Sequence, residues 1–373
     1  MLTLSKMLLN KKSIQKFFKF IIQSLFKFIY GEIKEKLNPD AEKSVVIKKT
    51  SIEKNFSYKL YMVKNGRLYT DTIHDTAIIF KNKIIEGASF QLRDNKNVKC
   101  EENVVFTKGT PRIKKNISGT VLSLLTGGGG NSNYWHWLFD VLPRIEIVKN
   151  FIRLEKIDYF LFPDLKEKFQ NQTLDCLGIS REKRLSSRNH RHFSADEIIV
   201  TDHPYNLLND PDRDSLNIPD WIILFLRKNF LISEKGNGNF PKKFFIDRSD
   251  SKSGHGKMRS IINEKEIRKL LEDMGFKFLV LSEYDFKDQI KLFNQAECIV
   301  GLHGAGFANV VFSRPNTKII ELQSDTAGEI IKNISEKNNL NYKSISMKPT
   351  ITTENQLGHI KINVNILKEK ILK

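Results

Sequence analysis

The segment that decides the fold reads Gly301-Leu302-His303-Gly304-Ala305-Gly306-Phe307-Ala308-Asn309. A short apolar run, residues 298–300, precedes it, and a second apolar run leads to Glu321. This pattern predicts a strand, a glycine turn, the start of a helix and then another strand. Glycines permit a tight turn and close approach of a ligand to the backbone. The first turn of a helix offers free N–H groups to anions. We therefore expect a phosphate-binding turn, with His303 as a further donor.

Strands and helices alternate on both sides of this turn after residue 236. The predicted strands are 244–246, 278–281, 298–300 and 318–322, and the predicted helices are 263–274, 285–296 and 305–312. This order favours a parallel, doubly wound sheet. Ligands of such sheets bind beyond the carboxyl ends of the strands. Because Arg248 and His303 each follow such an end, we expect them to line one crevice.

Two arginines strengthen the prediction of a phosphate site. Arg248 and Arg259 flank a polar loop that contains two glycines. A guanidinium group is planar and permanently charged, and it binds phosphate oxygens in pairs. The alternative is a solvated basic loop. Glu321 could accept hydrogen bonds from ribose hydroxyls, or it could be a surface or capping carboxylate. The predicted nucleotide and diphosphate site is Arg248, Arg259, His303, Gly304, Ala305, Gly306 and Glu321.

A second cluster reads Asn133-Tyr134-Trp135-His136-Trp137-Leu138-Phe139-Asp140 and continues to Pro143-Arg144. His136 and Asp140 are four residues apart, so they share one helix face. A carboxylate beside an imidazole orients the ring and raises its basicity, which suits a general base. The tryptophans offer flat faces on which sugars stack. The alternative is a buried aromatic helix with a structural His–Asp hydrogen bond. Pro143 is expected to kink or restart this helix.

Composition limits the classes of protein to consider. A chain of 373 residues suggests two domains with extensions. Lys and Arg number 61 against 43 Asp and Glu, a net charge of +18, which favours anionic partners: nucleic acid, acidic lipid, nucleotide sugars or acidic glycans. The three cysteines are far apart in the sequence and are typical of reduced thiols in the cytoplasm.

The N-terminus differs from the rest of the chain. Residues 1–31 contain six lysines and no acidic residue. At helical spacing one face gathers Ile14, Phe17, Phe18, Ile21, Ile22, Leu25, Phe28 and Ile29, and the opposite face gathers Lys12, Lys16, Lys19, Gln23 and Lys27. The apolar runs are shorter than the ~18 residues of a spanning helix, and their lysines argue against a signal peptide. We interpret this segment as a helix lying on an anionic membrane surface. The alternative is a helix packed on its own protein.

Three motifs in order along the chain resemble those of family-61 glycosyltransferases. They are Asn133-Tyr134-Trp135-His136-Trp137-Leu138-Phe139-Asp140-Val141-Leu142-Pro143-Arg144, then Ile246-Asp247-Arg248-Ser249 with Arg259 and Asn263-Glu264, and finally Val300-Gly301-Leu302-His303-Gly304-Ala305-Gly306 with Asn309 and Ile320-Glu321-Leu322. The similarity covers residues 55–345 and is greatest to the bacterial, surface-polysaccharide branch of the family.

The resemblance implies an α/β protein of GT-B type, with two Rossmann-like domains facing a central cleft, besides the N-terminal amphipathic helix. The expected segments are a membrane-associating helix in 1–36, an acceptor-binding domain in 37–235, a nucleotide-sugar-binding domain in 236–345 and an extension in 346–373.

The resemblance also implies an inverting mechanism without a metal or other cofactor. His136 is the first candidate for the base and Asp140 the second. The arginines, His303 and the 304–306 turn would stabilise the leaving diphosphate. The acceptor side would include Asn133, Trp135, Trp137 and Arg144. The expected partners are a nucleotide-sugar donor and a glycan or lipid-linked acceptor of capsule or lipopolysaccharide synthesis, on the inner face of the cytoplasmic membrane.

Three features favour other interpretations. Asp210-Pro211-Asp212-Arg213-Asp214 contains a D-x-D sequence, which binds metal and nucleotide in the other large glycosyltransferase fold. Its proline-rich setting favours a solvated turn or an acceptor-side loop. The net charge also suits a nucleic-acid-binding protein, but no such module is visible, and a third of the charge lies in the N-terminal segment. An inactive, membrane-anchored scaffold is a further alternative, although His136, Arg248, His303 and Glu321 are all present.

Overall fold

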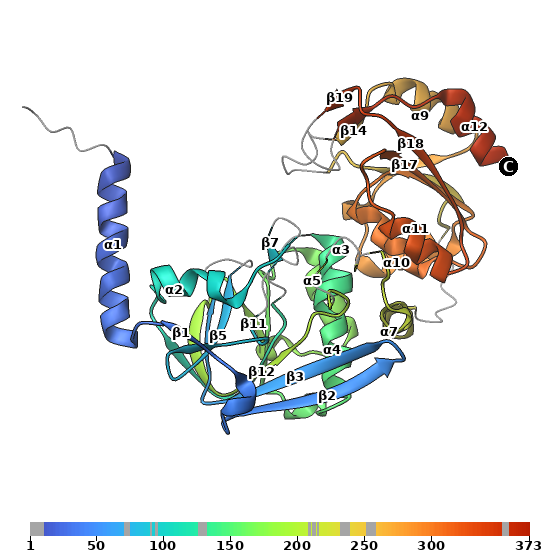
Figure 1. The fold of residues 1–373 in the computed structure, drawn as a ribbon. Helices are drawn as coiled ribbons and strands as arrows, with labels where there is room; N and C mark the ends of the chain where they lie inside the picture. Colours follow the sequence, from blue (N-terminus) through green and yellow to red (C-terminus); the bar gives the residue numbers. More distant parts are fainter. Residues whose placement is uncertain are drawn as a thin grey trace, which may run out of the picture.

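Two sheets organise the chain. The computed structural model describes residues 11–70, 75–89, 92–93, 96–125, 133–207, 210, 214, 216–231, 239–250, 259–352 and 358–373. A large mixed sheet occupies the N-terminal half, and a parallel sheet occupies the C-terminal half. Figure 1 shows these halves next to each other, with helix α1 (Lys11–Tyr30) standing apart at one side. The α/β class and the N-terminal helix predicted from the sequence are therefore confirmed.

Part of the N-terminal sheet is Rossmann-like. Its four parallel strands lie in the order β12-β9-β10-β11. Their bounds are β9 Lys115–Ser123, β10 Tyr159–Phe162, β11 Arg184–Ser186 and β12 His192–Thr201. The segments between them include α3 (Tyr134–His136), a π-helical turn η3 (Trp137–Val141), α4 (Pro143–Lys149), η4 (Leu154–Lys156), α5 (Lys168–Cys176) and η5 (Arg181–Lys183). The helix restart expected at Pro143 is confirmed.

An antiparallel extension continues this sheet from the other edge of β12. Strand β4 pairs with the first part of β12 and β3 with the second part. The Asn65-Gly66 turn joins these two strands, and Asn65 has a φ of 50°. The elements of the extension are β1 Glu35–Leu37, η1 Pro39–Ala41, β2 Val45–Glu53, β3 Phe56–Lys64, β4 Arg67–Thr70, β5 Thr76–Phe80, β6 Lys83–Ile85, β7 Leu92–Arg93, β8 Lys96–Asn97, η2 Cys100–Glu102 and α2 Val104–Lys108.

The C-terminal sheet is wholly parallel, in the order β15-β13-β16-β17-β18. Its strands are β13 Lys243–Asp247, β15 Lys277–Val280, β16 Cys298–Leu302, β17 Lys318–Ser324 and β18 Asn341–Met347. The order corresponds to 2-1-3-4-5, which reverses direction between the first and third strands. That switch point lies between β13 and β16. The carboxyl ends of these two strands therefore form the crevice in which such a sheet binds its ligand.

Helices connect these strands close to the predicted positions. They are α9 Glu264–Asp273, η6 Leu281–Glu283, α10 Phe286–Gln295, η7 Ala305–Phe312 and α11 Ile330–Lys337. Element η7 is a 3-10 helix, whereas an α-helix was expected from the glycine turn. Its bonds run over three residues, as from Phe307 N–H to Gly304 O at 3.0 Å. The N–H groups of Ala305 and Gly306 therefore precede the first bond of the helix.

The C-terminal segment packs on the same sheet. Strands β14 (Arg259–Ile261), β19 (Ile351–Thr352) and β20 (Gly358–Ile360) form a small sheet, and α12 (Val364–Leu372) follows it. Ile360, Leu367 and Ile371 share one buried cluster with Phe245 and Val300 of the parallel sheet. Residues after 346 thus contribute to the same hydrophobic core as the parallel sheet.

A shared apolar core joins the two halves. Helix α7 (Asp220–Phe230) contributes to both of them. Trp221 Nε1–H donates to Tyr58 Oη at 2.8 Å on the N-terminal sheet. At the other end of α7, the Phe230 ring lies edge-on to Phe286 and Phe312, at 5.0 and 6.4 Å between centroids. One buried cluster accordingly includes residues of both sheets. The glycine-rich stretches at 127–130 and 236–238 lie outside the described residues.

None of the helices described has the combination of length and apolar character that crossing a bilayer requires.

The shared core predicts a large stability loss on truncation of Phe230. Phe230→Ala should lower the free energy of unfolding by about 3–5 kcal/mol, because a fully buried aromatic side chain leaves a cavity. Leu224→Ala, at a position 65% exposed on the same helix, is the matched control and should change it by less than about 0.5 kcal/mol. Denaturant titration measures both. Equal effects of the two substitutions would contradict a core shared through α7.

Candidate active site

The glycine turn lies at the switch point, where two arginines meet one carbonyl. Arg248 Nη1–H and Arg259 Nη1–H both donate to the His303 carbonyl oxygen, at 2.8 and 2.7 Å. Burial lowers the pKa of Arg248, and burial together with the Arg248 charge lowers the pKa of Arg259 to about 10. Arg259 Nε is buried and has no hydrogen-bond partner among the described residues. Two cations that share a neutral acceptor carry charge that an anion would neutralise.

The glycine at 304 leaves room for this pair. A Cβ atom at Gly304 would lie 3.1 Å from Arg248 Cζ. Contacts that short force the neighbouring group to move. The turn and the Arg248 guanidinium are therefore packed against each other as the sequence pattern predicted. The polar loop between the arginines, residues 251–258, lies outside the described residues.

His303 forms a buried pair with Glu321. Its Nδ1–H donates to Glu321 Oε1, and Tyr342 Oη–H donates to Glu321 Oε2 at 2.6 Å. Glu321 is fully buried, so its carboxylate is committed to these two donors. The Glu321 carboxylate is enclosed by protein on the side of His303 away from solvent, so a ribose would not reach it. The Nδ1–H tautomer leaves Nε2 of His303 as the ring atom free to act on a ligand.

His136 and Asp140 form the second histidine–carboxylate pair. The distance from His136 Nδ1 to Asp140 Oδ2 is 2.7 Å, so the predicted i, i+4 contact is present. The His136 side chain is 31% exposed, and the Asp140 side chain 2%. Burial lowers the pKa of His136, but the charge and hydrogen bond of Asp140 outweigh burial and raise it. The imidazole is therefore both oriented and made more basic by Asp140.

Two residues that the sequence prediction missed complete this pair. Tyr205 Oη–H donates to Asp140 Oδ1 at 2.7 Å, and His203 Nε2 lies 3.5 Å from Asp140 Oδ2. His203 Nδ1 accepts the backbone N–H groups of Tyr205 and Asn206, so its proton is on Nε2 and faces Asp140. Burial raises the pKa of Asp140, but the charges and hydrogen bonds of His136 and His203 hold it well below its usual value. The available signal was the position of both residues just after the apolar run 198–200, which lies near the end of β12.

The residues predicted for the acceptor side divide into one exposed and three buried positions. Asn133 is exposed and caps α3, with Oδ1 accepting Trp135 N–H at 2.9 Å. Trp135 stacks on Phe139 in the core. Trp137 is fully buried, with Nε1–H donating to Thr173 Oγ1 at 2.8 Å. These tryptophan faces contact protein, so they support the helix that carries His136.

Arg144 is fully buried as well. Its Nε–H donates to the Asp140 carbonyl oxygen at 3.0 Å, and Nη1–H donates to Thr201 O at 3.4 Å. Burial lowers the pKa of Arg144 to about 10. The guanidinium thus ties α4 to the end of β12 beneath Asp140, where an acceptor would not reach it.

The two histidine pairs come from different halves that meet at α3 and η7. Tyr134 Oη–H donates to Asn309 Oδ1 at 2.6 Å, and Asn309 Nδ2–H donates to Gln289 Oε1 at 2.9 Å. Tyr134 lies two residues before His136 on α3, and η7 begins directly after Gly304. The structure therefore brings the His136 helix against the helix that starts at the glycine turn.

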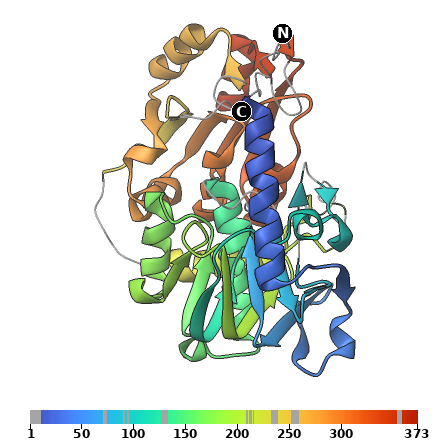
Figure 2. The same ribbon diagram turned by 90° about the vertical axis from the view of Figure 1, so that its left-hand side faces the viewer.

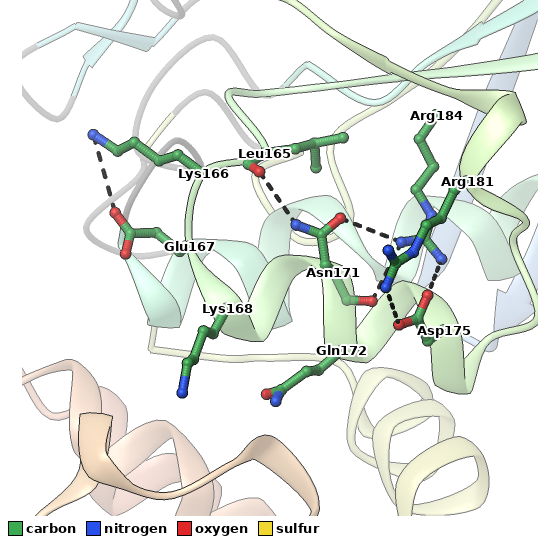
Figure 3. Close-up of a pocket in the computed structure, with 9 residues that line it drawn as sticks. All are labelled: Leu165, Lys166, Glu167, Lys168, Asn171, Gln172, Asp175, Arg181 and Arg184. Carbon is green, nitrogen blue, oxygen red and sulfur yellow. Dashed lines mark hydrogen bonds and ion pairs between the residues drawn. The ribbon is translucent and has the colours of Figure 1, made fainter.

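A separate hollow of about 530 Å³ lies beside α5 (Figure 3). It is lined by Leu165, Lys166, Glu167, Lys168, Asn171, Gln172, Asp175, Arg181 and Arg184. Figure 3 shows Arg184 turned toward Asn171 and Asp175, and these hydrogen bonds are internal to the protein. The hollow includes none of the predicted site residues, so we do not assign it a role in the reaction.

The D-x-D sequence is only partly described. Asp212 lies outside the described residues, Asp210 is exposed and Asp214 is buried. Asp214 N–H donates to Asp210 O at 2.8 Å. Within the described part of the chain, no group of three or more His, Cys, Asp and Glu side chains is placed to hold a metal ion. Independence from metals stays a prediction.

Substituting Asp140 tests the electrostatic coupling directly. In Asp140→Asn the pKa of His136 should fall below its wild-type value, because the negative charge that stabilises the imidazolium is removed. NMR titration of the histidine ring protons measures this shift. His190, whose Nδ1 contacts Ser186 O, is the internal control and should keep its pKa. An unchanged His136 titration would contradict the pairing.

Comparison with known proteins identifies the family. Residues 134–320, just over half of the chain, match the glycosyltransferase 61 family. The matched range includes His136, Asp140, both arginines and the glycine turn. No curated protein matches the chain. The chain therefore belongs to glycosyltransferase family 61, whose reaction transfers a sugar from a donor to an acceptor.

Proposed function

We propose that the protein is an inverting, metal-independent glycosyltransferase of GT-B type that uses a nucleotide-sugar donor. The acceptor would bind to residues 37–235 and the donor to residues 236–345, with 346–373 as an extension of the donor domain and 1–36 as a separate helical segment. The observation that carries this proposal is the contact of α3 with η7, because it packs the helix that carries His136 against the helix that begins at the glycine turn.

The donor diphosphate would bind at the switch point of the parallel sheet. Arg248 and Arg259 would contact its oxygens, and the N–H groups of Ala305 and Gly306 would add uncharged donors. His303 Nε2 would face the same group. Negative charge grows on the diphosphate as its bond to the sugar breaks. Donors that are already fixed in place stabilise that charge without reorganising.

His136 would act as the base. Its Nε2 would take the proton of the acceptor hydroxyl while the hydroxyl oxygen forms a bond to the anomeric carbon. The bond from that carbon to the diphosphate breaks on the opposite face, and its electrons leave with the diphosphate. The configuration at carbon is therefore inverted. Asp140, held as a carboxylate by His203 and Tyr205, would stabilise the imidazolium that forms.

The acceptor and its pathway complete the proposal. Asn133 lies exposed at the start of α3 and would contact the acceptor, whereas Trp135, Trp137 and Arg144 would support His136 from the core. We place the reaction in synthesis of a surface glycan such as capsule or lipopolysaccharide, with a glycan or lipid-linked acceptor, on the inner face of the cytoplasmic membrane.

Two variants separate donor binding from catalysis. His136→Asn should lower turnover by about 10²–10⁴-fold, while the thermal shift induced by the preferred nucleoside diphosphate remains. Arg248→Gln should abolish that thermal shift, because ligand binding to the native state raises apparent stability. UDP, GDP and dTDP are the diphosphate probes, and CMP tests binding of a nucleoside monophosphate. His190→Asn, on a histidine remote from Asp140, is the matched control and should leave both measurements unchanged. Wild-type turnover in His136→Asn would identify another base.

Metal removal provides a separate test. Activity should be retained in EDTA, because the arginines and the turn are expected to neutralise the diphosphate. Loss of activity in EDTA that manganese restores would instead assign a role to the D-x-D sequence.

A further inference from the structure

Helix α1 exposes its apolar face. The large hydrophobic side chains of α1 that are exposed are Ile14, Phe17, Phe18, Phe20, Ile21, Ile22, Leu25, Phe28 and Ile29. Phe17 is 62% exposed and Phe28 is 89% exposed. Apolar patches of this extent on a folded chain mark contact with a membrane or another molecule. Among the described residues, the body of the protein does not cover this apolar face.

The opposite side of the helix is attached to the protein. The partly covered residues of α1 are Gln23, Phe26, Lys27 and Tyr30, which recur at helical spacing along one stripe. This stripe belongs to the lysine face, since it includes Lys27. Figure 1 shows the helix joined to the N-terminal half at its C-terminal end, and Figure 2, viewed from that side, shows it lying in front of the body.

Tyr30 fixes this attachment. Its ring stacks on Phe26 at 5.7 Å and lies edge-on to His192 at 4.9 Å. Its hydroxyl accepts Lys114 N–H at 3.0 Å, and its carbonyl oxygen accepts Arg67 Nη1–H at 3.0 Å. His192 belongs to β12, the central strand of the sheet. The helix therefore leaves the sheet at a defined angle, with its apolar face turned outward.

The charge of α1 selects the partner. Lys12, Lys16 and Lys19 lie on the polar face opposite the apolar one, and the described helix contains no acidic residue. In a bilayer the apolar side chains enter the acyl region, and the lysine stems reach anionic headgroups. Pairing with a second copy would bring two acid-free helices together, and their like charges would repel.

We propose that α1 is a rigidly mounted docking helix that lies in the plane of an anionic bilayer through its apolar face. The attachment of α1 through Tyr30 would hold the crevice of the enzyme at a constant orientation to the membrane. A lipid-linked acceptor would then reach His136 without leaving the bilayer, a consequence that rests on the proposed function. Membrane binding itself depends only on α1 and is tested without any sugar.

Sedimentation of the full chain with lipid vesicles tests the proposal. The protein should sediment with vesicles of phosphatidylcholine and phosphatidylglycerol and stay in solution with phosphatidylcholine alone. Replacing Phe17, Ile21 and Phe28 by Gln should abolish binding. Replacing Lys12, Lys16 and Lys19 by Gln should weaken binding about tenfold or more. The matched control replaces Leu224, Ile351 and Leu372 by Gln, which are exposed apolar residues elsewhere, and should bind like the wild type.

Two further readouts decide between the outcomes. Transfer to a water-soluble acceptor should be equal in the Phe17/Ile21/Phe28 variant and the control, so a loss of membrane binding is distinguished from a failure of the proposed reaction. The proposal is overturned if the wild type does not bind anionic vesicles or if the two apolar triple variants bind equally. A wild-type dimer that only the α1 variant dissociates, without vesicle binding, would assign the face to a second copy.

Discussion

The site depends on one buried polar contact, the hydrogen bond from Tyr134 to Asn309. Asn309 is fully buried, and burial raises the pKa of Tyr134 well above its usual value, so the phenol stays neutral and donates. A buried polar group that loses its partner costs about 1–3 kcal/mol. The contact therefore helps to set how α3 of one half lies against η7 of the other.

The same arrangement of a histidine, a carboxylate and a tyrosine occurs in each half of the protein. A buried carboxylate accepts Nδ1–H of the ring, and a tyrosine hydroxyl occupies the other carboxylate oxygen: Tyr205 on Asp140 and Tyr342 on Glu321. The environments then differ. The carbonyl of His303 lies under two guanidinium groups, which favours a bound anion. Asp140 has a second histidine beside it, and the Arg144 guanidinium that binds the Asp140 carbonyl is fully buried. This difference is why we propose opposite roles for the two imidazoles.

Local sequence patterns were sufficient for much of the fold. The alternation after residue 240, the turn at Gly304 and the i, i+4 pair were all predicted, because each depends on neighbours within a few residues. The features that were not predicted depend on distant contacts. The role of His203 can be seen only once β12 is paired with β9. Arg144 is buried because its guanidinium reaches the Thr201 carbonyl at the end of β12. Likewise, the amphipathic pattern of α1 predicted a helix, but the packing of Tyr30 on His192 decides which face turns outward.

The most direct test of the account is a crystal structure of the protein with an unreactive nucleotide-sugar analogue. The account predicts the diphosphate on Arg248 and Arg259 at the carboxyl ends of β13 and β16, and the anomeric carbon facing the side of the cleft that carries His136 Nε2. A diphosphate bound in the hollow beside α5, or a sugar that points away from His136, would contradict it.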